Sequence, residues 1–389
     1  MRVVKKVESY LFAGIFVFSL LLFLAHTAYT KTAIFADGRY YYSITRSAVR
    51  DFDINFKNEF QFFGIEMETN KYGFPENFYP PGVSFLWIPS FWLADGFTQL
   101  LQTLVIKIDN SGFGIIHQVF VSAGNIFLGV LGLYILHNLL TTYFNKKLAT
   151  LATLSLFTTT NLLFYIAIEP INSHAASFFI SCLFVFALLK DKNSLLLGFL
   201  SGIAGITRTQ DLLLITLPGL KYLKERKIIN LAYLFLGLII GFLPQLFLWR
   251  VFYDTFWKSP YLKFGFNALA PQIIHVLFNT QNGLFTITPS IAFALIGLFI
   301  LRPRSPIIFL YSVFYFFIQI YIISSWSGFA QGGSFSIRMA ITTYPLLAFG
   351  LAQIIEKLYQ KFVSLGSYLT IFFFSFLNFA LIFRYLLSY

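Results

Sequence analysis

The chain has 389 residues, of which 57% are hydrophobic and only 11% are charged, and its mean hydropathy is +0.73. A soluble domain of this composition would expose large apolar patches and aggregate, so the sequence indicates an integral membrane protein. The one cysteine, Cys182, lies in an apolar run, which excludes a disulfide framework and a thiolate metal site within the chain.

The first apolar segment, residues 9–30, is long enough to cross about 30 Å of hydrocarbon. A basic stretch, MRVVKK, precedes it, which raises the alternative of a cleaved signal peptide. The segment is longer than the apolar region of a signal peptide, and no clear cleavage site of the small-x-small type follows it. We therefore expect a retained membrane span.

A long gap follows the first span, at residues 31–112, and it is rich in charged and aromatic residues. Its notable polar residues are Asp37, Arg39, Tyr40, Asp51, Asp53, Glu59 and Tyr79. Because lipid cannot solvate ionisable groups, a cluster of them directly after a membrane span is a candidate functional site.

Two helices are expected within this gap. Residues 39–50 place apolar side chains at a helical spacing opposite three arginines, which predicts a helix in the membrane interface. The apolar residues of that pattern are Tyr41, Ile44 and Ala48, and the arginines are Arg39, Arg46 and Arg50. A second apolar stretch, residues 82–106, contains Trp87 and Trp92, which suit the level of the lipid headgroups. We expect this stretch to lie on the same side as the rest of the gap.

Further spans are predicted at 113–138, 149–168, 173–189, 228–249, 284–301, 306–324, 339–355 and 363–387. Residues 194–219 carry Arg208 and Asp211 in their middle and are expected to form two short helices that meet at residues 207–211. The prediction is an all-α polytopic membrane protein of about 11 transmembrane helices, two of them short. We treat residues 1–389 as a single transmembrane domain, with residues 31–112 forming an extracytoplasmic loop and juxtamembrane helices.

The distribution of charge predicts the orientation. With the N-terminus in the cytoplasm, short cytoplasmic segments hold 15 of the 28 Lys and Arg residues, and 12 of the 16 Asp and Glu residues lie elsewhere. Cytoplasmic loops carry an excess of Lys and Arg, so this orientation is favoured, and the net charge of +12 needs no nucleic acid partner. The site is then expected on the extracytoplasmic side of a cell membrane.

Several short motifs along the chain resemble a known family. They include DGRYYYSITRSAVRDFDINFKNEF at 37–60, YPPG at 79–82, EPINSH at 169–174, GITRTQD at 205–211, QNGLF at 281–285 and GGSFSIR at 332–338. In their order and spacing these motifs resemble the GT-C glycosyltransferases. An uncharacterised bacterial branch, related to the protein O-mannosyltransferase-like enzymes, is more similar still.

The resemblance implies an inverting transferase that moves a sugar from a polyprenyl phosphate or diphosphate to an extracytoplasmic glycan, lipid or protein. It implies Asp37 as the general base, because GT-C enzymes carry an acid after the first span. The alternative is an interfacial carboxylate paired with Arg39 or Arg46. The resemblance also places Arg208 at the carrier phosphate, with a salt bridge to Asp211 or Glu169 as the alternative.

Other polar residues are candidates for substrate binding. Glu169 and His174 suit donor hydroxyls or proton transfer, and alternatively are a helix-end carboxylate and a buried histidine with satisfied hydrogen bonds. Trp326 suits stacking on a sugar and Arg338 suits an anionic group, or both belong to an ordinary turn. The remaining candidates are Arg39, Tyr40, Asp51, Asp53, Tyr79, Gln210, Asp211 and Gln281.

No cofactor is expected, and a divalent metal bound by Asp51, Asp53 and Asp37 is an open alternative. Two other functions were weighed. A lipid-sugar transporter would show matching broken helices in two halves of the chain, and no such pairing is visible. An oligosaccharide polymerase or ligase would have its large outer loop late in the chain, whereas here the large loop is early.

Overall fold

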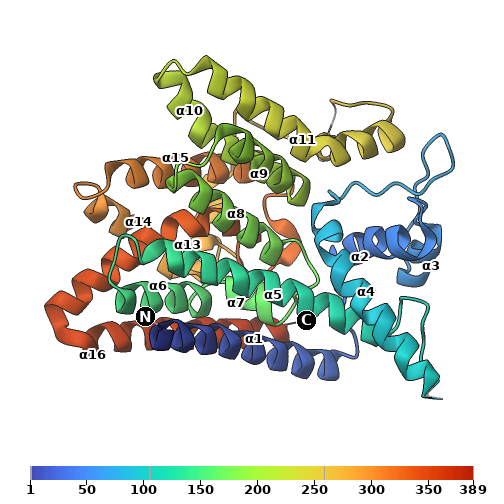
Figure 1. Ribbon diagram of the computed structural model, residues 1–389, viewed down its shortest axis with the longest axis horizontal. Coiled ribbons are helices and arrows are strands. Elements are labelled where there is room, and N and C mark those ends of the chain that lie inside the picture. The colour runs from blue at the N-terminus through green and yellow to red at the C-terminus, as the bar shows by residue number, and fades with distance from the viewer. Residues whose placement is uncertain (1, 105–106, 258, 389) are drawn as a thin grey trace.

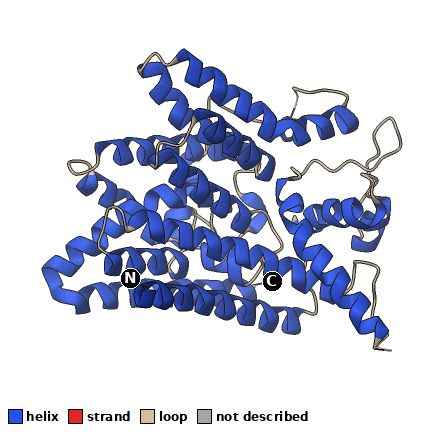
Figure 2. Ribbon diagram, in the orientation of Figure 1, coloured by secondary structure: helices blue, strands red, loops and turns tan. Residues whose placement is uncertain are grey.

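The protein is described by a computed structural model that covers residues 2–104, 107–257 and 259–388. Long helices run side by side across the molecule, and shorter helices gather at the right of the view (Figure 1). The described residues contain no strand, and β-pairing among them is confined to two isolated bridges, Thr69 with Pro75 and Phe266 with Trp326 (Figure 2). The predicted all-α class is confirmed.

Six helical segments in the described part of the chain are long and apolar enough to cross a membrane. They lie in α1 (Arg2–Thr30), α5 (Ile115–Leu140), α11 (Ile228–Tyr253), α15 (Pro306–Ser325) and, twice, in the stretch from Arg338 that includes α16 (Tyr344–Leu387). Shorter apolar helices accompany them: α8 (His174–Leu189), α9 (Ser194–Thr207) and α14 (Pro289–Leu301). The protein is therefore a multi-pass membrane protein, as predicted.

The last helix, α16, contains the two predicted spans 339–355 and 363–387 as two arms of a hairpin (Figure 1). The Ser367 hydroxyl donates to the Ile355 carbonyl at 3.5 Å, although 12 residues separate them. In a straight helix these residues would lie about 18 Å apart along the axis. The chain therefore folds back between the arms.

The predicted span 149–168 is interrupted, because α6 (Lys146–Thr158) ends before α7 (Leu162–Ala167) begins. The interruption frees backbone carbonyls inside the bundle, where no water can satisfy them. Asn378 on α16 donates to the Thr158 and Thr160 carbonyls, each at 2.9 Å, and Ser290 donates to the Thr159 carbonyl at 2.9 Å. A second break separates α13 (Leu284–Ile287) from α14 at Pro289.

The two short helices predicted within residues 194–219 are present. α9 is followed by the 3-10 helix η2 (Thr209–Ile215) and then by α10 (Thr216–Lys224). Arg208 lies between α9 and η2 in an extended conformation, with φ −150° and ψ 123°. α9 packs closely on α11, and a Cβ added to Gly202 would lie 2.6 Å from the Leu238 carbonyl. The break therefore presents the Arg208 side chain from a fixed backbone.

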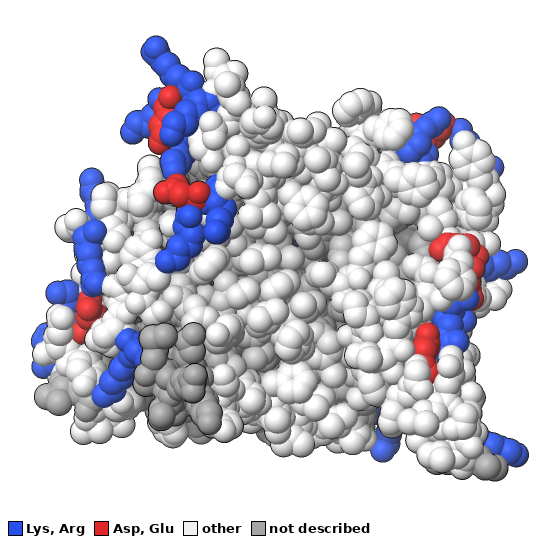
Figure 3. Space-filling model, in the orientation of Figure 1, with Lys and Arg blue, Asp and Glu red and all other residues white. Residues whose placement is uncertain are grey.

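Residues 38–103 fold at the right-hand end of the bundle in Figure 1. Their helices are α2 (Gly38–Arg46), the π-helix η1 (Ser47–Asp51), α3 (Lys57–Phe63) and α4 (Gly82–Thr103). α4 packs on α2 and α5 at this same end, as expected. Mainly basic side chains mark the opposite end, a mixed group of charges marks this one, and a broad uncharged face lies between (Figure 3).

Two details of the predicted interfacial helices are wrong. Arg46 was expected on the solvated face of the helix, but it is buried, and it pairs with carboxylates from η1 and α3. Trp87 was expected at the headgroup level, but it is fully buried and its ring packs against Tyr41 at 6.4 Å. Trp92, on another face of α4, is 61% exposed, and its position at the headgroups stays a prediction.

Candidate active site

Asp37 lies at the start of α2, where the chain leaves α1, and its carboxylate is held from two sides. Oδ2 pairs with Nη2 of Arg338 at 2.8 Å, and Oδ1 accepts a hydrogen bond from the Tyr79 hydroxyl at 2.9 Å. The alternative pairing with Arg39 or Arg46 is therefore not formed. A carboxylate has about four lone-pair positions, so this one can still accept a proton or a further hydrogen bond.

Tyr79 reaches Asp37 from the loop that leads into α4. Its ring stacks on Tyr40 at 4.6 Å and on Phe78 at 4.5 Å between ring centroids. Burial and the neighbouring Asp37 carboxylate raise the pKa of the Tyr79 hydroxyl. Tyr79 therefore stays protonated and acts as a hydrogen-bond donor that orients Asp37.

Glu169 lies in the loop between α7 and α8, close to both Asp37 and Arg338. Burial is the main cause that raises the pKa of its carboxyl group to about 7, the positive charge of Arg338 opposes this, and Asp37 adds to it. The backbone carbonyl of Glu169 accepts from Asn172, which closes the loop. A group whose pKa lies this near neutrality changes charge in the physiological range.

Arg208 forms the second half of the site. Its Nη1 donates to the Ser173 hydroxyl at 2.9 Å and to Nδ1 of His174 at 2.8 Å. A guanidinium can only donate, so Nδ1 of His174 must be the unprotonated nitrogen. Arg208 forms no ion pair with a carboxylate among the described residues, and Asp211 instead accepts from Ser177 at 2.6 Å. The alternative salt bridges to Asp211 or Glu169 are therefore not formed.

Aromatic and hydroxyl side chains join the two halves. The Tyr41 hydroxyl donates to Ser173 at 3.2 Å, and the Tyr41 ring packs against Tyr79 at 5.1 Å. The Tyr165 ring packs on His174 at 4.5 Å. We call the whole group the Asp37 centre. Its members are Asp37, Tyr41, Tyr79, Tyr165, Glu169, Ser173, His174, Arg208 and Arg338.

Three buried nitrogen donors beside this centre have no hydrogen-bond partner among the residues that the structure describes. They are Nε of Arg208, Nε2 of Gln210 and Nε1 of Trp326. Gln210 is held through its backbone carbonyl, which accepts from Gln319 at 3.0 Å. Buried polar groups are almost always hydrogen bonded, so unpaired donors that share one region suit a ligand rich in acceptor oxygens.

Other predicted site residues lie elsewhere. Arg39 and Gln281 are exposed, and Gln281 lines a separate cavity. Asp51 lies about 20 Å from Asp37 along the α2–η1 helical segment, at 1.5 Å per residue. Asp53 follows η1 and accepts from Ser47 at 2.7 Å. The proposed metal set of Asp37, Asp51 and Asp53 is therefore not assembled, and the described residues contain no metal-type cluster of three or more His, Cys, Asp or Glu.

The sequence analysis missed the roles of Ser173, Tyr165 and Tyr41. Ser173 lies inside the EPINSH motif, but a serine beside a histidine gives no signal of its own. Tyr41 was assigned only to the apolar side of a helix, although its hydroxyl reaches Ser173. Because 20% of the chain is aromatic, composition gave no reason to select Tyr41 or Tyr165.

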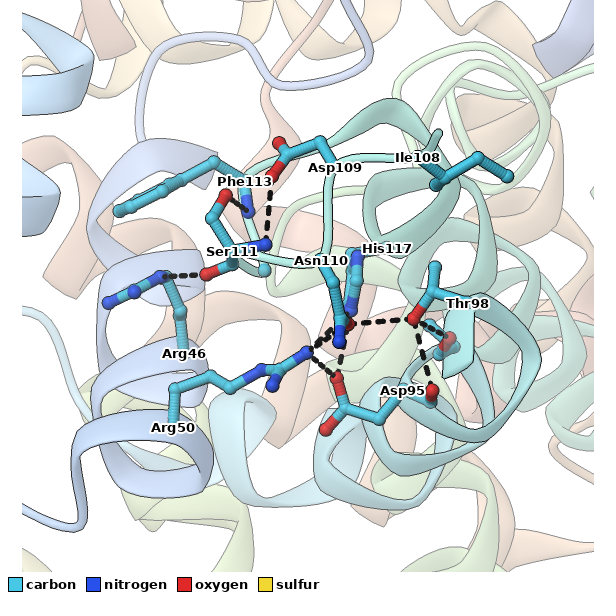
Figure 4. Close-up of polar contacts among 12 residues, drawn as sticks. Arg46, Arg50, Asp95, Thr98, Ile108, Asp109, Asn110, Ser111, Phe113 and His117 are labelled. Carbon is cyan, nitrogen blue, oxygen red and sulfur yellow. Dashed lines mark hydrogen bonds and ion pairs between the residues drawn. The ribbon is translucent and has the colours of Figure 1, made fainter. Parts of the chain in front are cut away.

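A second group of charges, the Arg46 cluster, lies around η1, and Figure 4 labels four of its residues, Arg46, Arg50, Asp95 and His117. Its members are Arg46, Arg50, Asp51, Glu59, Asp95 and His117. Arg46 pairs with Asp51 at 2.7 Å and with Glu59 at 2.5 Å, and donates through Nε to the Ser111 carbonyl at 3.0 Å. Arg50 pairs with Asp95, which also contacts His117 at 2.8 Å. The cluster fastens η1 to α3, α4 and the start of α5.

The fold is similar to that of a solved structure. The chain resembles ArnT from Cupriavidus metallidurans bound to undecaprenyl phosphate, with a TM-score of 0.59 and 13% sequence identity. It has an ArnT-like, GT-C-like fold. The similarity covers 91% of this chain and 60% of the ArnT chain, so the protein spans about three fifths of the length of that neighbour. No protein-family model and no curated protein matches the sequence.

Proposed function

We propose that the protein is an inverting glycosyltransferase that moves a sugar from a polyprenyl-phosphate donor to a hydroxyl group of an extracytoplasmic acceptor. One observation carries the proposal: the Arg208 guanidinium forms no ion pair among the described residues, and Ser173, Tyr41 and Tyr79 link it to the Asp37 carboxylate within one centre. The ArnT-like fold supports it, because ArnT was solved with undecaprenyl phosphate bound.

In the proposed step, the acceptor hydroxyl oxygen attacks the anomeric carbon of the donor sugar from the face opposite the phosphate. Its proton passes to an oxygen of Asp37 while the new carbon–oxygen bond forms. The bond between the anomeric carbon and the phosphate oxygen breaks, and its electron pair leaves with the phosphate. The products are the glycosylated acceptor with inverted configuration and polyprenyl phosphate, and Asp37 then releases its proton.

In the proposed step, residues of the chain orient the base, stabilise the leaving phosphate and bind the sugar. Arg338 and Tyr79 fix the orientation of the Asp37 carboxylate. Arg208 offers a positive charge to the phosphate, whose negative charge grows as it leaves. An unpaired arginine within a membrane protein is costly, and a bound phosphate removes that cost. The unpaired donors of Gln210 and Trp326 suit the sugar oxygens.

Binding of undecaprenyl phosphate to the purified protein tests the proposal. Arg208→Ala should weaken this binding by about 2 to 5 kcal/mol, which is roughly 30-fold to more than 1,000-fold. Undecaprenol lacks the charge and should bind both proteins equally. Arg226→Ala, which removes an exposed arginine at the basic end, is the matched control and should change neither affinity. Equal binding of undecaprenyl phosphate by a folded Arg208→Ala protein would remove Arg208 from the site.

We further propose that the N-terminus is cytoplasmic and that the Asp37 centre opens on the extracytoplasmic side. The excess of Lys and Arg at the opposite end supports this orientation. A cysteine at Tyr72, which is 57% exposed, should react with an impermeant thiol reagent in intact cells, whereas one at Lys224 should react only after permeabilisation. Cys182 is buried, so its background reaction is small. The reverse labelling pattern would invert the orientation.

A further inference from the structure

A cavity with both polar and apolar lining lies apart from the Asp37 carboxylate, between α12 (Ile273–Phe278), the residues that follow it and the last turns of α16. Its volume is about 500 Å³, which is within the range of roughly 300 to 1,000 Å³ typical of small-molecule sites. The proposed transfer step does not use it.

A positive charge and amide groups line this cavity. Arg384 comes from α16 and forms no ion pair or hydrogen bond within the described part of the chain. Asn279 and Gln281 come from the loop after α12. Oδ1 of Asn279 accepts from the Gln281 backbone N–H at 2.8 Å, which orients the amide group of Asn279. Amides beside an unpaired guanidinium suit a ligand with both hydroxyl groups and a negative charge.

Aromatic rings form another wall of the cavity. The rings of Phe335 and Tyr385 both line it and pack together at 5.5 Å. Asn282 donates to the Ala330 carbonyl at 2.6 Å, which ties the α12 side to the loop that carries Phe335. Tyr385 is the more accessible ring, because Phe335 is only 2% exposed, and an aromatic ring beside amide groups suits the apolar face and the hydroxyl edge of one sugar ring.

One layer of side chains separates this cavity from the Asp37 centre. Phe335 precedes Arg338 by three residues, and its backbone carbonyl accepts from the Tyr165 hydroxyl at 3.2 Å. The Tyr165 ring in turn packs on His174. A molecule in the cavity therefore lies against the same loop that positions Arg338, and through it Asp37.

We propose that this cavity binds an acidic sugar unit of the acceptor, at a distance from the hydroxyl that reacts. Arg384 pairs with the phosphate or carboxylate of that unit, and Asn279 and Gln281 hydrogen bond to its hydroxyl groups. The inference rests on the proposed function and adds to it the class of acceptor, an anionic glycan. Binding a remote part of the acceptor helps to orient the reacting hydroxyl.

Ligand binding to the purified full-length protein, measured by saturation-transfer NMR, tests this proposal. The probes are glucuronic acid, glucose 6-phosphate and uncharged glucose. The two acidic sugars should bind about tenfold more tightly than glucose, because only they engage Arg384. Arg384→Gln should remove this preference, whereas Arg384→Lys should keep part of it. Arg302→Gln is the matched control, because Arg302 is also an exposed arginine at the C-terminal end of a helix.

Two outcomes would overturn the proposal: equal binding of all three sugars, or an acid preference that Arg384→Gln leaves intact. A third outcome would also overturn it. If phosphatidylglycerol in nanodiscs binds through Arg384 and neither acidic sugar binds, the cavity is a site for a lipid headgroup. Asp37→Asn should leave acidic-sugar binding unchanged. If the wild-type protein binds the acidic sugars but not undecaprenyl phosphate, the result would count against the transferase proposal and not against the cavity.

Discussion

The Asp37 centre and the Arg46 cluster both bring buried or partly buried arginines together with carboxylates, and both draw on the segment that follows α1. In the Arg46 cluster each arginine faces a carboxylate, and Glu59 is fully buried against Arg46. In the Asp37 centre Arg338 is paired, but Arg208 contacts only a serine and a neutral histidine nitrogen. The two groups have similar residues but differ in whether every arginine forms an ion pair with a carboxylate.

This difference separates a structural role from a functional one. A compensated cluster can fix the arrangement of helices without any ligand, because each buried charge already has its partner. A partly buried guanidinium that forms no ion pair is less favourable by itself and becomes favourable when an anion binds. Substitutions in the Arg46 cluster should therefore alter stability, and substitutions in the Asp37 centre should alter binding and turnover.

The largest expected effect follows from Asp37→Asn. The amide keeps the shape of the side chain but cannot accept the proton, so transfer should fall by about 10² to 10⁴-fold. The protein should still insert, purify and bind undecaprenyl phosphate. The measurement is the rate of sugar transfer from a polyprenyl-phosphate sugar.

Asp53→Asn is the matched control for this prediction, because it makes the same change in the same segment at a residue that contacts Ser47. Its transfer rate should stay close to that of the wild type. Near-normal turnover by Asp37→Asn, together with inactivity of Glu169→Gln, would move the base to Glu169.

The next effect concerns stability. Arg46→Gln leaves Glu59 buried without its cation, and losing one partner of a buried ion pair costs about 3 to 5 kcal/mol where the carboxylate stays ionised, so the loss should be measured above about pH 7. The unfolding temperature in detergent should fall clearly. The double variant Arg46→Gln/Glu59→Gln should recover much of the loss, because no buried charge remains unpaired.

Arg208→Gln should lower the unfolding temperature little or not at all, because it removes a charge that has no carboxylate partner. An equal loss in Arg46→Gln and Arg208→Gln would end the distinction between the two groups.

Much of the fold could be predicted from the sequence, because span length and charge placement are local properties. The short helix pair around Arg208 was predicted because the hydrophobic segment there is too long for one span and has Arg208 and Asp211 in its middle. The break between α6 and α7 was missed, because the freed carbonyls of Thr158 and Thr160 are satisfied by Asn378, more than 200 residues later, and that of Thr159 by Ser290. The burial of Trp87 likewise depends on packing against distant helices.

The candidate site was only partly predictable. Asp37, Tyr79, Arg208 and Arg338 were named individually, but Asp37 is held by Tyr79, 42 residues later, and by Arg338, about 300 residues later. Proximity in sequence suggested Arg39 or Arg46 as partners of Asp37. Helix geometry excludes Arg46, since it lies at the opposite end of α2 and faces the carboxylates of α3 and η1.

The smallest expected effect compares two buried glutamates, one from each group. Burial raises the pKa of both Glu59 and Glu169 from 4.5 to about 7. A carboxyl group whose folded pKa is raised contributes stability that is complete below about pH 4.5 and is lost as the pH rises through about 7. The unfolding temperature should therefore fall over this range, and replacing either glutamate by glutamine should reduce the fall.

The pH dependence of turnover should distinguish Glu169 from Glu59. An ionised Glu169 near Asp37 disfavours a second negative charge and so favours proton transfer to Asp37, which makes kcat/KM rise as the pH passes about 7. Glu169→Gln should abolish this rise, with a change of less than about tenfold at any pH, because the charge acts only from a distance. Glu59→Gln should keep the rise, because Glu59 acts on Arg46 instead. Identical pH profiles of kcat/KM in the two variants would show that Glu169 has no electrostatic influence on the transfer step.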